Sequence, residues 1–210
     1  METVEALAAR LRSNPADREA FQSLKALYRQ RGDFASLANL IAGWAGWVPD
    51  DRAAAAAYVE VGDLLGSELR DSTQAQTFYL EALRRDPTNL GACDALHGLW
   101  EADRQFQKLA ELLHNQIDLH SRQGTAPKQL AVLRYRLGEL CAKHLQQPVE
   151  ALQQYREALE LDPSMLRAMY EARQLCIAQG DLRGAAQLYE SEAAVEPNTE
   201  RRASLLAELA

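Results

Sequence analysis

The chain has 210 residues, of which 47% are hydrophobic and 25% are charged, and its formal net charge is −7. This composition is typical of a folded globular protein, and the acidic balance argues against a protein that binds nucleic acid through its phosphates. No apolar run approaches the roughly 18 residues of a membrane-spanning helix, and no basic-then-apolar signal segment opens the chain. We therefore expect no membrane insertion and a cytoplasmic location.

Apolar residues recur at helical spacing through the first part of the chain. The helices predicted there span residues 2–12, 17–30, 34–48 and a segment that opens with the five alanines at 53–57. The first of these carries Val4, Leu7 and Leu11 on one face. Gly32 lies in the tight turn between the second and third helices, where a left-handed backbone suits glycine.

The third helix ends in Gly-Trp-Ala-Gly-Trp, which places aromatic rings at Trp44 and Trp47. Two interpretations of this pair remain open. The rings can fill the space that the alanines at 53–57 leave. Alternatively, they can form an exposed aromatic contact site, since tryptophan is favoured at interaction hot spots.

The helical pattern continues to the end of the chain. Predicted helices span residues 73–85, 88–102, 105–122, a pair within and just before the stretch 137–163, and then 164–178, 182–195 and 198–210. Residues 121–127 (SRQGTAP) are interpreted as a loop, because the pattern resumes in register after them. We expect one domain over residues 1–210. Because the last helix stops at Ala210 without a polar cap, we also expect these residues to be a segment of a longer protein.

The stretch 137–163, LGELCAKHLQQPVEALQQYREALELDP, is the template for the rest. Gly138 and Ala158 are small residues inside helical patterns, which suggests two helices in close contact with larger side chains around them. Pro163 ends the second helix. The same residue types recur 76 positions earlier, which indicates a second copy of one helical hairpin. The matching sets are Leu137-Gly138, Ala151, Tyr155, Ala158-Leu159 and Pro163, and Val61-Gly62, Ala75, Tyr79, Ala82-Leu83 and Pro87.

Shorter matches extend the repeat towards both ends. Asn14-Pro15 aligns with Asp86-Pro87 at a shift of 72 positions, and residues 31–34 align with 179–182 at a shift of 148. The repeating unit is therefore a pair of hairpins, and the two hairpins of a unit differ in type. Residues 2–12 then correspond to the second helix of a hairpin.

The template resembles the tetratricopeptide repeat, whose motif fixes residue types at these spaced positions. The resemblance implies an all-α fold, an α-solenoid (right-handed superhelix) of about five such helix hairpins plus partial flanking helices. It also implies that the chain binds other proteins, but it does not identify a partner.

The sequence shows no constellation typical of catalysis or of metal binding. His97, His114, His120 and His144 lack the i, i+4 spacing of a helical metal site, and none sits beside a cysteine at ligand spacing. The three cysteines form no CxxC motif, and the repeat places all of them at core positions. We predict no enzyme activity and no cofactor.

In the tetratricopeptide-repeat family, the first helix of each hairpin lines a concave groove that holds an extended peptide or a partner helix. Carried over by alignment, this implies a groove with an acidic middle and an aromatic far end. The candidate partner-binding residues are Asp63, Asp94, Glu101, Tyr135, Glu139, Tyr170, Gln174 and Ile177. Such a groove favours a protein or peptide partner with Lys or Arg and an apolar anchor near the tyrosines. The alternative is that these carboxylates are only solvated surface positions. The Lys and Asn residues of the family's clamp for a C-terminal carboxylate are absent.

Three functions remain in competition. The chain can be a non-catalytic adaptor or scaffold that binds a partner in the groove, or it can be a targeting or regulatory arm of a larger multidomain enzyme. The third function is a self-assembling structural solenoid, because uncapped ends would expose apolar helix faces.

Overall fold

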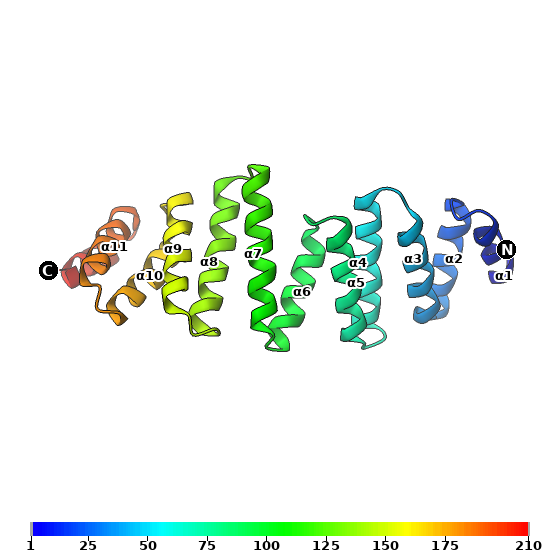
Figure 1. Ribbon diagram of the computed structural model, residues 1–210, viewed down its shortest axis with the longest axis horizontal. Helices are drawn as coiled ribbons and strands as arrows, with labels where there is room; N and C mark the ends of the chain where they lie inside the picture. Colours follow the sequence, from blue (N-terminus) through cyan, green and yellow to red (C-terminus); the bar gives the residue numbers. More distant parts are fainter. Residues whose placement is uncertain (1, 210) are drawn as a thin grey trace. The chain divides into compact units, whose positions relative to one another are not determined.

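A computed structural model describes residues 2–209, and of residues 205, 206, 208 and 209 it describes only the backbone. Within this range the chain forms twelve α-helices and no β-strand, which confirms the predicted all-α class (Figure 1). The end of the helix predicted over residues 198–210, at Ala210, lies outside the described residues. Among the described residues, no helix combines the length and the apolarity that crossing a bilayer requires.

The chain divides into two compact units, Met1–Asp103 and Arg104–Ala210, and each is described by itself. The first unit contains α1 (Val4–Ser13), α2 (Arg18–Arg31), α3 (Phe34–Trp47), α4 (Asp51–Ser67), α5 (Ser72–Arg85) and α6 (Leu90–Ala102). The second contains α7 (Phe106–Gln123), α8 (Pro127–Lys143), α9 (Pro148–Leu161), α10 (Leu166–Ala178), α11 (Leu182–Val195) and α12 (Thr199–Leu209). The expectation of a single domain over residues 1–210 stays a prediction.

Within each unit, every helix packs mainly on the helices next to it in the sequence, as in a solenoid. The hairpins α2–α3 and α4–α5 make up most of the first unit, and α8–α9 and α10–α11 most of the second. The first helices of these hairpins are α2, α4, α8 and α10, and the second helices are α3, α5, α9 and α11. The alignment of the repeat assigns α1 as the second helix of a hairpin, and α6 and α12 as first helices of hairpins.

The two helices of a hairpin approach closely at the repeat glycines Gly62 and Gly138. A Cβ atom added at Gly138 would lie 2.6 Å from Cε1 of Tyr155, and one added at Gly62 would lie 2.5 Å from Cε1 of Tyr79. Both tyrosine side chains are buried. The predicted close contact of the two helices is therefore confirmed, and it is a contact between a tyrosine ring and a glycine backbone.

The proline turns repeat in three dimensions. The residues before Pro15, Pro87 and Pro163 have nearly the same backbone angles, with φ of −140°, −132° and −138° and ψ of 92°, 95° and 88°. After two of these prolines, the hydroxyl and the N–H of Thr88 and Ser164 donate to the preceding aspartate. These two residues therefore belong to turns. The helices predicted to start at residues 88 and 164 begin two residues later.

Helix ends follow the local chemistry of their residues. Gly32 has φ of 67°, so the predicted left-handed turn is confirmed. The next residue, Asp33, caps α3 by accepting the N–H of Ser36, and Asp71 caps α5 in the same way. The loop predicted at residues 121–127 shortens to 124–126 between α7 and α8.

Two of the three cysteines occupy core positions as predicted. Cys141 and Cys176 are buried, whereas Cys93 is only partly buried. Burial raises the pKa of the Cys93 thiol to about 11, and the nearby carboxylates of Asp94 and Asp86 raise it further in the same direction. The Cys93 thiol is therefore protonated at neutral pH and a poor nucleophile.

We expect Gly138→Ala to lower the free energy of unfolding by about 1–2 kcal/mol. Its methyl group would overlap the Tyr155 ring, at a cost of about 1–3 kcal/mol, against a gain of up to about 1 kcal/mol in helix propensity. Gly98→Ala in α6 is the matched control, because nothing lies within 4 Å of its added Cβ. This control should stabilise the chain. Urea denaturation would contradict the packing argument if the two variants were equally stable.

Cys93 should react slowly with iodoacetamide, with a rate that rises about tenfold between pH 8.5 and 9.5. A thiol of pKa about 11 is mostly protonated throughout this range, whereas the rate of an unperturbed thiol rises less than about twofold. Mass spectrometry of the labelled peptides resolves the three cysteines. Asp94→Asn removes a neighbouring negative charge and should speed labelling of Cys93. A rise of only about twofold over this pH range would show that the pKa of the thiol is not perturbed.

Candidate functional site

A cleft of about 440 Å³ opens in the second unit between α8, α10 and α12. It lies on the face formed by first helices, which we call the first-helix face. It is lined by Tyr135, Glu139, Leu166, Arg167, Tyr170, Glu171 and Arg201. Three of the predicted groove residues, Tyr135, Glu139 and Tyr170, are therefore brought together.

Helical periodicity explains why these side chains share one surface. Tyr135 and Glu139 are four residues apart on α8, and Arg167 and Tyr170 are three apart on α10, so each pair lies on one face of its helix. The opposite faces of both helices are buried in the core. Those buried faces are formed by Leu137, Leu140 and Cys141 on α8, and by Ala168, Met169, Ala172 and Cys176 on α10.

The cleft carries charges of both signs. Burial, followed by the Glu139 and Glu171 carboxylates, raises the pKa of Tyr135 to about 12, while Arg167 acts in the opposite direction. Glu139 lies 2.5 Å from Nζ of Lys143, and this hydrogen bond raises the pKa of the lysine. Lys143 and Arg201 add positive charge that the sequence analysis did not weigh. The surface is therefore mixed in this unit, and Glu139 is not a free carboxylate.

Within the described part of the chain, the tyrosine of the repeat forms a side-chain hydrogen bond in the first unit, at Tyr79, but not in the second, at Tyr155. In the first unit, the hydroxyl of Tyr79 donates to Oδ1 of Asp63 at 2.8 Å. The equivalent residues in the second unit are Tyr155 and Glu139, but the buried Tyr155 hydroxyl has no partner among the described residues. Burial raises the pKa of Tyr155, and Glu171 and Glu139 of the cleft raise it further. A buried donor thus lies within the electrostatic influence of the cleft.

A buried ion pair between α10 and α11 lies next to Tyr170, one of the residues that line the cleft. Nε of Arg173 lies 3.1 Å from Oε2 of Glu192, and both side chains are almost completely buried. The guanidinium also lies over two tyrosine rings, 4.0 Å from the centre of the Tyr189 ring and 5.2 Å from that of Tyr170. The pair therefore joins α10 to α11 beneath the exposed face of Tyr170.

The same cluster extends to α12 through Arg201. This guanidinium lies 3.6 Å from Glu192 and 3.3 Å from the buried Glu196, and the neighbouring Arg202 donates to the backbone carbonyl of Glu196. These contacts position Arg201 at the edge of the cleft. The sequence analysis missed the cluster. The available signal was Glu192, a carboxylate beside Ala193 on the otherwise apolar inner face of α11.

The remaining predicted groove residues lie in both units. Asp63 on α4, and Asp94 and Glu101 on α6, are exposed and belong to the first unit, so the eight-residue groove stays a prediction. Glu101 has Nδ1 of His97 at 3.7 Å as a neighbour. The other two residues, Gln174 and Ile177, are exposed on α10 beyond the cleft.

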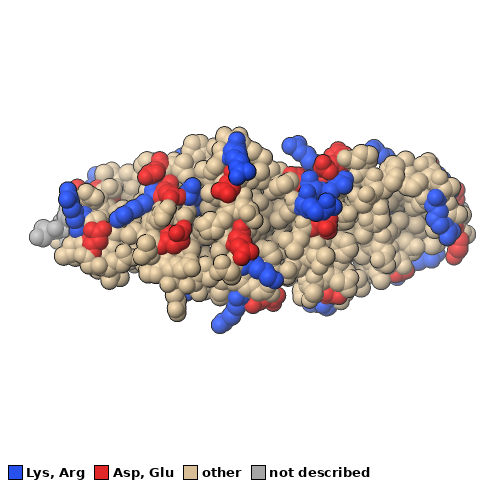
Figure 2. Space-filling model, in the orientation of Figure 1, with Lys and Arg blue, Asp and Glu red and all other residues tan. Residues whose placement is uncertain are grey.

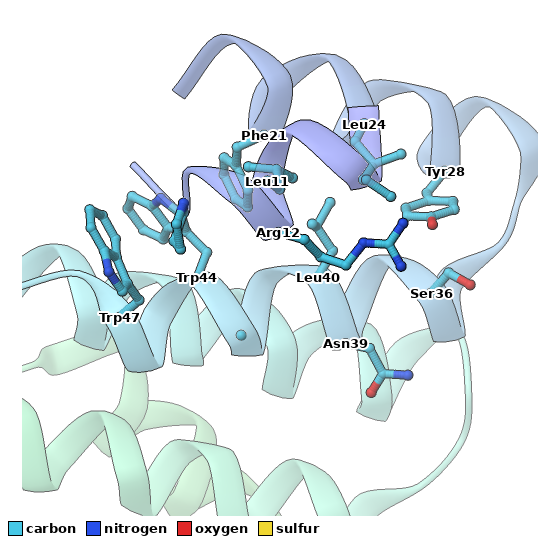
Figure 3. Close-up of a pocket in the computed structure, with 13 residues that line it drawn as sticks. Leu11, Arg12, Phe21, Leu24, Tyr28, Ser36, Asn39, Leu40, Trp44 and Trp47 are labelled. Atoms are coloured by element: carbon cyan, nitrogen blue, oxygen red, sulfur yellow. The ribbon is translucent and has the colours of Figure 1, made fainter. Parts of the chain in front are cut away.

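The tryptophan pair lies on the other side of the first unit. The Trp44 ring stacks on the Phe21 ring of α2, with the two ring centroids 5.0 Å apart. Trp47 is 46% exposed. Both rings line a second pocket, of about 450 Å³, between α1, α2 and α3 (Figure 3).

Charged side chains are otherwise scattered over the surface. On the face that Figure 2 shows, acidic and basic residues are interspersed in each unit, and the area over α3 carries no charge. The sequence of α3 contains no charged residue. In the part of the chain that the structure describes, no group of three or more His, Cys, Asp or Glu side chains could hold a metal ion.

We expect Arg173→Met to destabilise the second unit by about 3–5 kcal/mol, because it leaves the Glu192 carboxylate buried without its main counter-charge. Replacing both partners, in Arg173→Met with Glu192→Leu, should recover most of this loss. Arg84→Met removes an exposed ion pair with Glu81 and should change stability by less than about 0.5 kcal/mol. Urea denaturation of the four proteins checks this, and additive losses in the double variant would contradict it.

Comparison with known proteins agrees with the repeat. Residues 55–89 match one family model described as a tetratricopeptide repeat, and residues 144–209 match another. No curated protein sequence matches the chain.

Solved structures share the fold along nearly the whole chain. YrrB, described as a tetratricopeptide-repeat protein with an unusual peptide-binding site, has a TM-score of 0.54 and 16% identity over 98% of this chain and 100% of its own. The C-terminal part of a repeat protein from Cytophaga hutchinsonii has a TM-score of 0.55 and 19% identity, over 91% and 73% of the two chains. PilF of Pseudomonas aeruginosa has a TM-score of 0.50 and 19% identity, over 91% and 82%. At these identities the likeness shows the fold alone, which is the predicted α-solenoid. Together with the two repeat matches, at residues 55–89 and 144–209, it supports a tetratricopeptide-repeat protein.

Proposed function

We propose that this chain is a non-catalytic adaptor in the cytoplasm, and that its second unit binds a segment of a partner protein in the cleft between α8, α10 and α12. The tetratricopeptide-repeat fold is in general a scaffold for protein–protein interaction. The observation that carries the proposal is the cleft itself, where aromatic and charged side chains meet on the first-helix face. The peptide-binding site named for YrrB, a protein of the same fold, is consistent with this kind of ligand.

The lining indicates the chemistry of the partner segment. Tyr170 is 43% exposed and lies beside Tyr135 and Leu166, so it offers an aromatic surface to an apolar side chain. Glu171 has no ion-pair partner among the described residues and can pair with a Lys or Arg of the ligand. Arg167 can donate to a peptide carbonyl, and the Tyr155 hydroxyl is a further buried donor near these charges. The proposed ligand therefore has an apolar anchor followed or preceded by a basic residue.

The acidic residues of the first unit belong to the same proposal as a second contact. Asp94 and Glu101 are seven residues apart on α6, which places them on one face of that helix, and both are exposed. They offer carboxylates to basic residues of a partner segment that binds the first unit.

Selection of peptides from a random library on the immobilised chain tests this function. Enriched peptides should contain an apolar residue close to Lys or Arg. Calorimetry should show that Tyr170→Ala weakens binding of the tightest selected peptide by about thirtyfold, as expected for a hot-spot aromatic residue. Glu171→Lys should also weaken binding, most strongly at low salt.

Two control variants test whether loss of binding is specific to the cleft and to the aromatic ring. Leu182→Ala removes an apolar side chain that is 71% exposed on the second helix α11, and it should leave affinity unchanged. Tyr170→Phe retains the ring over Arg173 and should retain binding. If the selected peptides bind Tyr170→Ala as tightly as the unmodified chain, the cleft is not the binding site. Unchanged affinity of a long basic peptide for Asp94→Lys with Glu101→Lys would remove the first unit from the proposal.

A further inference from the structure

A furrow runs along the second-helix side of the first unit, between α1 and α3, with α2 as its floor (Figure 3). Its volume of about 450 Å³ is within the range of binding pockets for small ligands and side chains. It is separate from the cleft described above, since α1, α2 and α3 of the first unit form it. The cleft lies on the first-helix face of its unit, whereas the furrow lies on the side of the second helices α1 and α3.

One end of the furrow is aromatic. Trp44 stacks on Phe21 with an interplanar angle of 20°, and the exposed Trp47 projects beside it (Figure 3). Leu11 and Leu40 continue the apolar wall. An exposed tryptophan next to a buried aromatic stack is a strong anchor for a large apolar side chain.

The other end of the furrow has an arginine that lacks a counter-charge. Arg12 is the one charged residue that lines the furrow, and in the described part of the chain its guanidinium has no ion pair and no hydrogen bond. Figure 3 shows it extended along the furrow towards Tyr28. Its neighbour on α1, Arg10, is by contrast paired with Glu2, Asp17 and Glu19. Arg12 therefore favours an anionic group on whatever occupies the furrow.

The second unit contains an equivalent furrow without the aromatic wall. A shift of 148 positions places Leu11, Pro15 and Phe21 onto Leu159, Pro163 and Met169, which line a pocket of about 520 Å³ between α9, α10 and α11. At the equivalent positions, Glu192 stands in place of Trp44 and pairs with the buried Arg173, and Glu160 stands in place of Arg12. This pocket has arginines elsewhere, Arg156 and Arg183, and Arg156 lies 3.4 Å from the Asp181 carboxylate that lines the same pocket. The fold makes the furrow in both units, but only the first has the aromatic wall with an arginine as its one charged lining residue.

We propose that the furrow between α1 and α3 binds a segment of a partner protein that carries a Leu or Phe side chain with an Asp or Glu a few residues away. The apolar side chain occupies the aromatic end, and the carboxylate pairs with Arg12. The amide of Asn39 and the hydroxyl of Tyr28 offer hydrogen bonds to a peptide backbone. A fatty carboxylate has the same charge and apolarity, but it would leave these polar groups unused, so the occupant is a peptide.

Intrinsic fluorescence provides a direct assay. The chain has three tryptophans, of which Trp44 and Trp47 line the furrow and Trp100 is buried in α6. The probe is the blocked, tryptophan-free peptide SEELFEELSG, and its matched partner is SKKLFKKLSG. The acidic peptide should change the emission with saturation below about 1 mM. The basic peptide should bind the furrow, as reported by the same emission change, at least about fivefold more weakly.

Three variants decide the outcome in the same fluorescence titration, which reports on the furrow because no tryptophan lines the cleft of the second unit. Arg12→Glu should weaken binding of the acidic peptide at least about fivefold, and the furrow should then bind the basic peptide more tightly than the acidic one. Trp47→Ala should also weaken it, and both changed side chains are exposed, so the fold is expected to persist. Arg183→Glu alters an exposed arginine of the equivalent furrow in the second unit and should leave affinity within twofold.

Other results would overturn the proposal. They are no saturable binding of the acidic peptide, equal affinity for both peptides, or unchanged affinity in Arg12→Glu. Saturable binding of decanoate where the acidic peptide does not bind would identify a fatty carboxylate as the occupant instead. Because Tyr170→Ala in the cleft should not affect this titration, failure here and failure of the cleft can be told apart.

Discussion

The contact of a tyrosine ring with a glycine backbone is the constraint on which each well-matched hairpin depends. Tyr155 can be buried against α8 only because Gly138 has no side chain, and Tyr79 uses Gly62 in the same way. This contact fixes the distance and register of the two helices. The opposite face of the first helix is then free to vary, so the same scaffold can present different surfaces in different copies.

That freedom produces chemical differences between equivalent positions. Asp63 is short enough to accept the hydroxyl of Tyr79, whereas Glu139 bonds Lys143 and leaves Tyr155 without a partner. Burying a hydroxyl without a hydrogen bond costs free energy, which a water molecule or a ligand carbonyl can recover. Such a group is stable only because the surrounding packing holds the ring in place.

The two sites use opposite sides of the hairpins and opposite charge preferences. The cleft combines tyrosines with an unpaired Glu171, and the furrow combines tryptophans with an unpaired Arg12. In the second unit, the position equivalent to Trp44 is Glu192, whose buried pair with Arg173 holds α10, α11 and α12 together. One repeat position thus lines an open furrow in one unit and holds helices together in the other, because each unit has its own neighbouring charges.

The sequence by itself determined the elements and the repeat. Periodic apolar residues, the glycine–tyrosine spacing and the recurring prolines specify helices, close contacts and turns, all of which depend on residues near one another in the chain. Helix starts after Pro87 and Pro163 were missed by two residues, since hydrogen bonds to the preceding aspartates extend these turns. Only the tertiary structure decided which side chains meet. The stacking of Trp44 on Phe21, the pairing of Arg173 with Glu192 and the isolation of Arg12 each depend on how separate helices pack, which no local pattern specifies.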